Sequence, residues 1–252
     1  MLHDSLTIQE VVDSDCAHEF LKEATKLASS EELQDIGARL AEKERVFRKL
    51  LSPEALDGLG KEELKAVLGL IFRFRRKSGF LLRENGLERI REETRALLYG
   101  QAPLASRFDR FAGAIHTPAG SQVSSLASEL LHYSQPDRYW LWTSWIWDPK
   151  TGAGALSLVT SDKVDLSGGS DGQIYENVGR VTAMVDAAGH GEGYSSAGRG
   201  LAGTNVFLAC VYTVYMYAVF KMKLSQEFNR ILPELPELAR RLLGVHRIEE
   251  VQ

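Results

Sequence analysis

In the first half of the chain, apolar residues recur at intervals of three and four positions, which places them on one face of an α-helix. Successive faces consist of Leu33, Ile36, Leu40 and Phe47; Leu64, Val67, Leu68, Ile71 and Phe72; Ile90, Thr94 and Leu97; and Leu104, Phe108 and Phe111. Ser30 and the pair Ser52–Pro53 are typical of helix starts, and Gly100 is typical of a helix end. The pattern predicts a series of consecutive helices.

The second half of the chain has a different pattern. Residues 155–160 (ALSLVT) could form a strand, residues 162–172 form a turn-rich loop, and residues 174–185 return to helical spacing. A glycine-rich connection then leads into an apolar helix at 206–220 and a C-terminal helical segment. The expected fold class is mainly α: a multi-helix globular domain with a small irregular or β insertion around 150–200.

The change of pattern divides the chain into two regions. Residues 1–148 form a helical region with a basic face and a tryptophan-rich segment. Residues 149–252 hold the insertion, the buried apolar helix and a C-terminal helix. We expect the two regions to pack as one unit.

The run from Val206 to Phe220 (VFLACVYTVYMYAVF) is nearly free of polar side chains. It is shorter than the roughly 20 residues that cross a bilayer, so a buried core helix is favoured over a membrane-associated segment. The N-terminus lacks a basic start followed by a long apolar run, which disfavours a signal peptide. The expected location is the cytoplasm, with no transmembrane span favoured.

Composition excludes several classes of protein. The 252 residues are 44% hydrophobic and 25% charged, which are ordinary values for a globular protein, and the net charge of −4 argues against a wholly basic nucleic-acid wrapper. The two cysteines, Cys16 and Cys210, are too few for a disulfide scaffold or a four-cysteine metal site.

Basic residues are concentrated in one part of the chain. Between Arg39 and Arg95 there are 15 Lys or Arg residues and 10 Asp or Glu residues. The densest run comprises Arg73, Arg75, Arg76 and Lys77. Such a run at a helix end is typical of a solvated face that complements the helix dipole, and it could also bind an anion or a phosphate backbone, with Arg83, Arg89 and Arg91 extending the patch.

All four tryptophans lie within eight residues, at positions 140, 142, 145 and 147. They follow a predicted helix that bears Val123, Leu126 and Leu130 and is broken at Gln135–Pro136–Asp137. Large aromatic side chains supply either a core or an interface. The candidate binding residues here are Trp140, Trp142 and Trp145.

The layout of residues 117–148, a Pro118/Gly120 turn, a helix and a short following segment, resembles the helix-hairpin-helix region of the DNA glycosylase superfamily. In that alignment Ala127 takes the position of a small alanine, whereas Ser121 and Val123 replace the hairpin glycines. Ser125 stands where bifunctional members carry a lysine, and Thr143 stands where the family carries its catalytic aspartate. The resemblance therefore implies a related helical architecture without glycosylase activity.

Other motifs are incomplete. Glu129 and His132 form a single E-x-x-H pair, and without a second such pair we interpret it as a polar helix flank rather than a metal site. The Asp- and Gly-rich loop at 162–172 does not match a calcium-binding EF-hand, so a solvated turn is favoured. His190, Tyr194 and Arg199 belong to a glycine-rich segment at 189–203 that could bind a phosphate or another small ligand, although its spacing matches no phosphate-loop motif.

The hypothesis favoured by these patterns is a non-catalytic helical binding protein. Its basic face and aromatic patch would engage a macromolecular partner, either protein or nucleic acid, and the protein would need no metal or cofactor. The alternatives are an enzyme with a site at the 189–203 loop and a membrane-associated protein that uses the 206–220 helix. The oligomeric state stays open, a homo-oligomer included.

Overall fold

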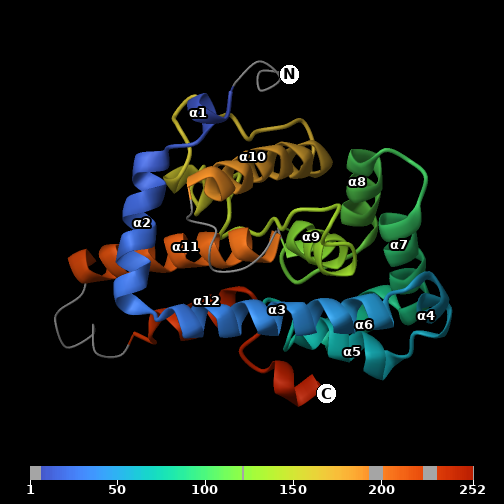
Figure 1. Cartoon of the computed structure of the whole chain (residues 1–252). Coiled ribbons are helices and arrows are strands. Elements are labelled where there is room, and N and C mark those ends of the chain that lie inside the picture. The colour runs from blue at the N-terminus through green and yellow to red at the C-terminus, as the bar shows by residue number, and fades with distance from the viewer. Residues whose placement is uncertain (1–6, 121, 193–200, 224–231, 252) are drawn as a thin grey trace. The chain divides into compact units, whose positions relative to one another are not determined.

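The computed structural model describes residues 7–120, 122–192, 201–223 and 232–251. The protein is 68% helical. In the described ranges there are twelve α-helices, labelled in Figure 1, and no strand. This confirms the mainly α fold class.

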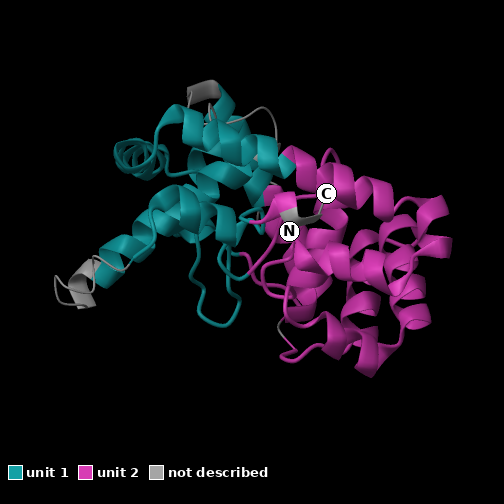
Figure 2. Cartoon of the chain, turned by 90° about the horizontal axis from the view of Figure 1, so that it is seen from below, with its two compact units in different colours: residues 1–40, 144–165, 181–246 teal, residues 41–143, 166–180, 247–252 magenta. Residues whose placement is uncertain are grey.

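The chain divides into two compact units, coloured separately in Figure 2. Unit 1 comprises residues 1–40, 144–165 and 181–246, and unit 2 comprises residues 41–143, 166–180 and 247–252. Helices α3 (Ser30–Leu50) and α10 (Asp171–Glu192) each contribute residues to both units. The units are therefore interleaved in sequence and do not follow the expected division at residue 148.

Unit 2 is built around α9 (Gln122–Ser134), in which every residue from Val123 to Ser134 is buried. Helices α7 and α8 pack against α9. The further whole helices of unit 2 are α4 (Pro53–Gly58), α5 (Lys61–Gly69), α6 (Ser78–Asn85), α7 (Leu87–Tyr99) and α8 (Leu104–Ala114), followed by the short 3₁₀ helix η3 (Ile248–Val251). A helix buried on all sides forms the centre of this unit.

Unit 1 is organised around α11 (Leu201–Lys223), which crosses α2 (Ser14–Leu27) and also packs against α12 (Leu235–Leu242) (Figure 1). Helix α2 buries Ala17 and Ala24, and their small side chains allow the two helices to approach closely. The remaining elements are α1 (Ile8–Val11) and the 3₁₀ helix η1 (Leu156–Leu158).

Helix starts follow local capping chemistry. Helix α3 begins with a reciprocal pair: the Glu32 backbone N–H donates to the Ser29 hydroxyl at 3.2 Å, and the Ser29 N–H donates to the Glu32 carboxylate at 2.8 Å. The cap is thus Ser29, one residue before the expected Ser30. At α4 the Ser52 hydroxyl accepts from the Ala55 N–H at 3.1 Å, with Pro53 at the first helical turn as predicted.

Two local predictions were wrong. Residues 155–160 contain η1 instead of a strand, and only Thr160 forms a single bridge, with Val12. Helix α5 ends at Gly69, so the helical spacing that placed Phe72 inward does not continue. In the turns that follow, Phe74 is buried and Phe72 is 50% exposed.

Candidate functional site

The basic run predicted as a binding face lies in the connection between α5 and α6, which we call the basic turn (residues 71–77). Consecutive backbone turns stabilise this segment. In one of them the Phe74 and Arg75 N–H groups donate to the Ile71 carbonyl at 2.8 and 3.0 Å. Arg76 is exposed and forms no ion pair with any residue that the structure describes, whereas Arg73, Arg75 and Lys77 are half-buried. The cations are therefore close in sequence but unequal in their access to solvent.

Two of these cations also interact with residues of α9. The Lys77 ammonium donates to the Gln122 side-chain carbonyl at 3.0 Å, at the start of α9. The positive charge of Arg73 helps to lower the pKa of the Glu129 carboxyl, against the larger effect of burial, which raises it. The basic turn is thus anchored to α9 on one side and presents Phe72 and Arg76 to solvent on the other.

The proposed extensions of the patch are largely engaged elsewhere. Arg83 pairs with Glu84 at 3.1 Å, and Arg91 pairs with Glu88 at 2.8 Å and also donates to the Leu59 carbonyl at 2.6 Å. Arg89 is exposed on α7. The available cationic surface is therefore smaller than the sequence suggests.

The tryptophan-rich segment is core, which corrects the expected aromatic patch. Trp142 is 4% exposed and Trp145 is 6% exposed, so neither ring is available to a partner. The backbone N–H of Trp142 donates to the Ser128 hydroxyl at 2.6 Å. The centroid of the Trp142 ring lies 6.0 Å from that of the Phe108 ring, within unit 2. Trp140 is half-buried, against Gly179 of α10. These side chains fill space between helices, because removing their large apolar surface from water is favourable.

Unit 2 contains a fully buried ion pair that the sequence did not reveal. The Lys43 ammonium of α3 donates to the Glu129 carboxylate of α9 at 2.8 Å, and the Lys43 side chain has no exposed surface. The ammonium also lies 3.8 Å from the centroid of the Tyr133 ring, a cation–π contact. Burial lowers the pKa of Lys43 and raises that of Glu129, although each charge stabilises the other. In the sequence, Lys43 lies between Leu40 and Phe47 on the apolar face of its helix. That position is the sequence feature that could have indicated a buried ion pair.

His132 completes this buried polar cluster. Its Nδ1 N–H donates to the Tyr139 carbonyl at 2.7 Å, and burial lowers the pKa of the imidazole to about 4. The E-x-x-H pair is therefore in the core, and its interpretation as a polar flank was wrong. No group of three His, Cys, Asp or Glu side chains converges as metal ligands in the described ranges. A neutral imidazole and a buried, hydrogen-bonded ion pair stabilise one packing of α9.

The positions aligned with the glycosylase-type residues are also buried. Ser125 is 4% exposed, and Thr143 is 4% exposed with no hydrogen-bond partner for its hydroxyl among the described residues. A neutral, buried hydroxyl does not supply the carboxylate or amine that base excision needs. Whether the hairpin resemblance reflects a related architecture stays a prediction.

The glycine-rich candidate site falls largely outside the described residues, which exclude Tyr194 and Arg199. His190 is exposed near the end of α10, and its Nδ1 N–H donates to the Asp186 carbonyl at 2.9 Å. At the other end of α10, its first residue Asp171 accepts a hydrogen bond from the Ser124 hydroxyl. These contacts organise the ends of α10.

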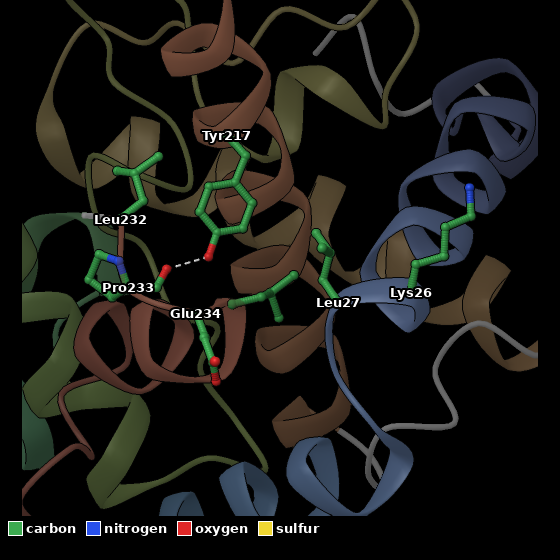
Figure 3. A pocket seen from close by; sticks show the side chains of 7 residues that line it. Lys26, Leu27, Tyr217, Leu232, Pro233 and Glu234 are labelled. Atoms are coloured by element: carbon green, nitrogen blue, oxygen red, sulfur yellow. Dashed lines mark hydrogen bonds between the residues drawn. The ribbon is translucent and has the colours of Figure 1, made fainter. Parts of the chain in front are cut away.

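Unit 1 has two cavities beside the crossing of α2 and α11. One, of about 380 Å³, is lined by Leu27, Leu232 and Leu235 and by Tyr217 of α11. Figure 3 shows the Tyr217 hydroxyl directed at the Pro233 carbonyl, to which it donates, while Lys26 points away from that bond. The second, of about 300 Å³, lies between the first half of α2 and Val214.

Helix α11 is only partly covered. Residues from Val206 to Val211 are at most 3% exposed, whereas every residue from Val214 to Phe220 is half-buried or exposed. Burial raises the pKa of the Cys210 thiol to about 12. By length and composition the window Gly203–Phe220 could cross a membrane, and 56% of it is buried. The expected core helix is thus correct for its first half only.

The chain matches no protein-family model, and searches among curated proteins and solved structures found no match.

Proposed function

We propose that this chain is a non-catalytic helical binding protein whose basic turn engages an anionic macromolecule. The observation that supports this is Phe72, a large aromatic side chain that is 50% exposed and immediately precedes a run with four cations. Exposed aromatics surrounded by Lys and Arg are typical of surfaces on which nucleic-acid bases stack while phosphates meet the cations. Nucleic acid is therefore the favoured partner, and an acidic protein segment is the competing one.

The buried cluster on α9 supports a binding role over a catalytic one. Lys43, Glu129 and His132 are the described groups whose chemistry resembles a catalytic set, and all three are sealed from solvent. A surface-binding function needs only that α9 hold the basic turn in place, which the Lys77–Gln122 hydrogen bond favours.

A titration of labelled single-stranded and double-stranded DNA, at low and at physiological salt, tests the proposal. Binding through phosphates weakens steeply as salt rises. We expect Phe72→Ala and Arg76→Glu to weaken binding at least about tenfold. Lys150→Glu, a reversal of an exposed cation in unit 1, is the matched control and should have no effect.

The outcomes separate the two partner classes. Equal competition by polyglutamate would move the proposal to an acidic protein segment, because polyglutamate offers charge without bases. Absence of binding to either polymer at low salt would contradict the proposed function. The cytoplasmic location and the oligomeric state stay predictions.

A further inference from the structure

Unit 1 carries an apolar groove that the basic turn does not involve. It lies between α2 and α11, with Cys16, Phe20 and Val214 contributing its apolar lining and a volume of about 300 Å³. Cavities of this size accept one or two large apolar side chains. The groove thus has room for a large apolar side chain.

Further large apolar side chains of unit 1 are exposed outside this groove, and one of them, Leu27, lines the other cavity. Leu27 at the end of α2 is 45% exposed, and Tyr215 on α11 is 36% exposed. The four large hydrophobic side chains that are exposed in the described ranges are Ile8, Leu27, Phe72 and Tyr215, and three of them belong to unit 1.

Carboxylates line one side of this groove. Asp15, Glu19 and Glu23 follow one another at four-residue intervals on α2, so they form one row along the helix, roughly 6 Å apart. Asp15 forms no ion pair with a described residue, Glu19 forms an exposed i,i+3 pair with Lys22 at 3.3 Å, and Glu23 forms one with Lys26 at 2.5 Å. Such exposed pairs are weak and can be replaced by a partner's cations.

The charge of the whole unit has the same sign. Unit 1 contains 17 acidic and 11 basic residues, a net charge of −6, whereas unit 2 contains 17 acidic and 19 basic residues, a net charge of +2. A cationic partner is therefore attracted to the unit that carries the groove, and its approach is accelerated at low salt.

We propose that the groove between α2 and α11 binds a cationic amphipathic helix of a partner protein. A large apolar side chain of that helix enters between Phe20 and Val214. Its Lys or Arg residues, one turn to either side, meet Asp15, Glu19 and Glu23. Recognition of an amphipathic helix by an apolar groove with an oppositely charged rim follows the helix-in-groove mode.

Charge disfavours the other occupants of this surface. A symmetric dimer across the groove would bring the carboxylate rows of two copies, each unit carrying −6, close together. An anionic bilayer would likewise repel Asp15, Glu19 and Glu23. A cationic helix is the occupant that gains from both the apolar lining and the rim.

The test uses the full chain and a synthetic peptide of leucine and lysine arranged as an amphipathic helix. Binding is followed by fluorescence anisotropy and by protection of Cys16 from alkylation. Cys16 is exposed in the groove, whereas Cys210 is buried, so labelling is selective. A hydrogen bond to the Asp13 carboxylate raises the pKa of Cys16, and alkylation is therefore run at mildly alkaline pH.

We expect saturable binding that slows alkylation of Cys16 and weakens as salt rises. Glu19→Lys should weaken binding at least about tenfold. The matched control is Glu62→Lys in unit 2, because Glu62 forms the same kind of exposed i,i+3 pair, with Lys65 at 2.7 Å. Phe20→Ser should weaken binding while leaving the anisotropy response to DNA unchanged, which separates this site from the basic turn.

Each of the following results would overturn the proposal. They are absence of peptide binding at low salt, equal weakening by Glu62→Lys and Glu19→Lys, binding without protection of Cys16, and a wild-type dimer that Phe20→Ser dissociates. Tighter binding to phosphatidylcholine vesicles than to the peptide would also overturn it, because a bilayer would then be the occupant.

Discussion

Helices α9 and α11 are each the central helix of their unit, yet they differ in sequence and in burial. The more polar of the two helices is the more deeply buried one. Helix α9 contains serines, a glutamate and a histidine, and all its residues from Val123 to Ser134 are buried. Helix α11 is almost entirely apolar, yet its residues from Val214 to Phe220 are half-buried or exposed. For these two helices, the polarity of the sequence therefore does not predict burial.

The difference follows from the partners that surround the side chains of each helix. In α9 three of the buried polar side chains have partners: Ser128 accepts from the Trp142 N–H, Glu129 pairs with Lys43, and His132 donates to the Tyr139 carbonyl. Paired polar groups can be buried without a large penalty. In α11 the residues from Val214 to Phe220 expose apolar surface that the described residues of unit 1 do not fully cover.

The largest expected effect distinguishes the two halves of α11. Val206 has no exposed surface, so Val206→Asp would bury an unpaired carboxylate and should prevent folding, a loss of more than about 4 kcal/mol. Val214 is half-buried, and Val214→Asp should reduce the free energy of unfolding by about 1 kcal/mol. Circular dichroism with urea unfolding measures both. If both variants unfold, the outer half of α11 is core as well.

The next effect concerns the ion pair in the core of unit 2. Lys43→Met leaves the Glu129 carboxyl buried without its partner and should cost about 3–5 kcal/mol of stability. The double variant with Glu129→Leu should recover most of that loss, because two apolar side chains replace both partners. In the exposed control pair, Lys65→Met should change stability by less than about 0.5 kcal/mol. Additive losses in the double variant would contradict the direct pairing.

A pH dependence tests the burial of His132. Its pKa in the folded state is about 4, below the ordinary value of 6.5, so between these values the unfolded chain binds a proton that the folded chain does not. Stability from this group is thus complete above pH 6.5 and is lost as pH falls to about 4, by about 3 kcal/mol in total. Urea unfolding at pH 7 and pH 5 should show a smaller difference for His132→Gln than for the wild type. His116→Gln, at an exposed position, is the control and should retain the wild-type difference.

The smallest expected effect is at Tyr133. Its ring is fully buried against Phe47, with centroids 5.4 Å apart, and its hydroxyl has no hydrogen-bond partner among the described residues. Tyr133→Phe removes an unsatisfied polar group and should be neutral or stabilising by up to about 1 kcal/mol. A clear loss in thermal unfolding would mean that the hydroxyl has a partner, such as an ordered water.

Sequence periodicity predicted the helices well where a helix has one apolar face and marked ends. The helix from Leu87, with Ile90, Thr94 and Leu97 inward, corresponds to α7, and Ser52–Pro53 starts α4 as expected. It failed at Phe72, because α5 ends at Gly69 and the residues beyond it follow turn geometry. It also failed at 155–160, where an apolar run forms a 3₁₀ turn.

The candidate surfaces were harder to predict because they depend on which side of a helix its neighbours leave uncovered. The cations at 73–77 were found from composition, yet which of them faces solvent is set by contacts such as the Lys77–Gln122 hydrogen bond, 45 residues apart. The tryptophans were as compatible with a patch as with a core. Lys43 within the stripe of Leu40 and Phe47 was the one sequence signal for the ion pair, since a lysine there needs a buried partner.

Comparing the accessibility of α9 and α11 tests the central claim most directly. In a Cys16→Ser background, one cysteine is placed on each helix, at Tyr215 of α11 and at Ser125 of α9, where the replacement is nearly isosteric. Alkylation under native conditions should modify the cysteine at 215 rapidly and the cysteine at 125 at least about 100-fold more slowly, because the latter reacts only when the unit opens. Equal protection at both positions in the isolated protein would contradict the account, since α11 would then be as covered as α9.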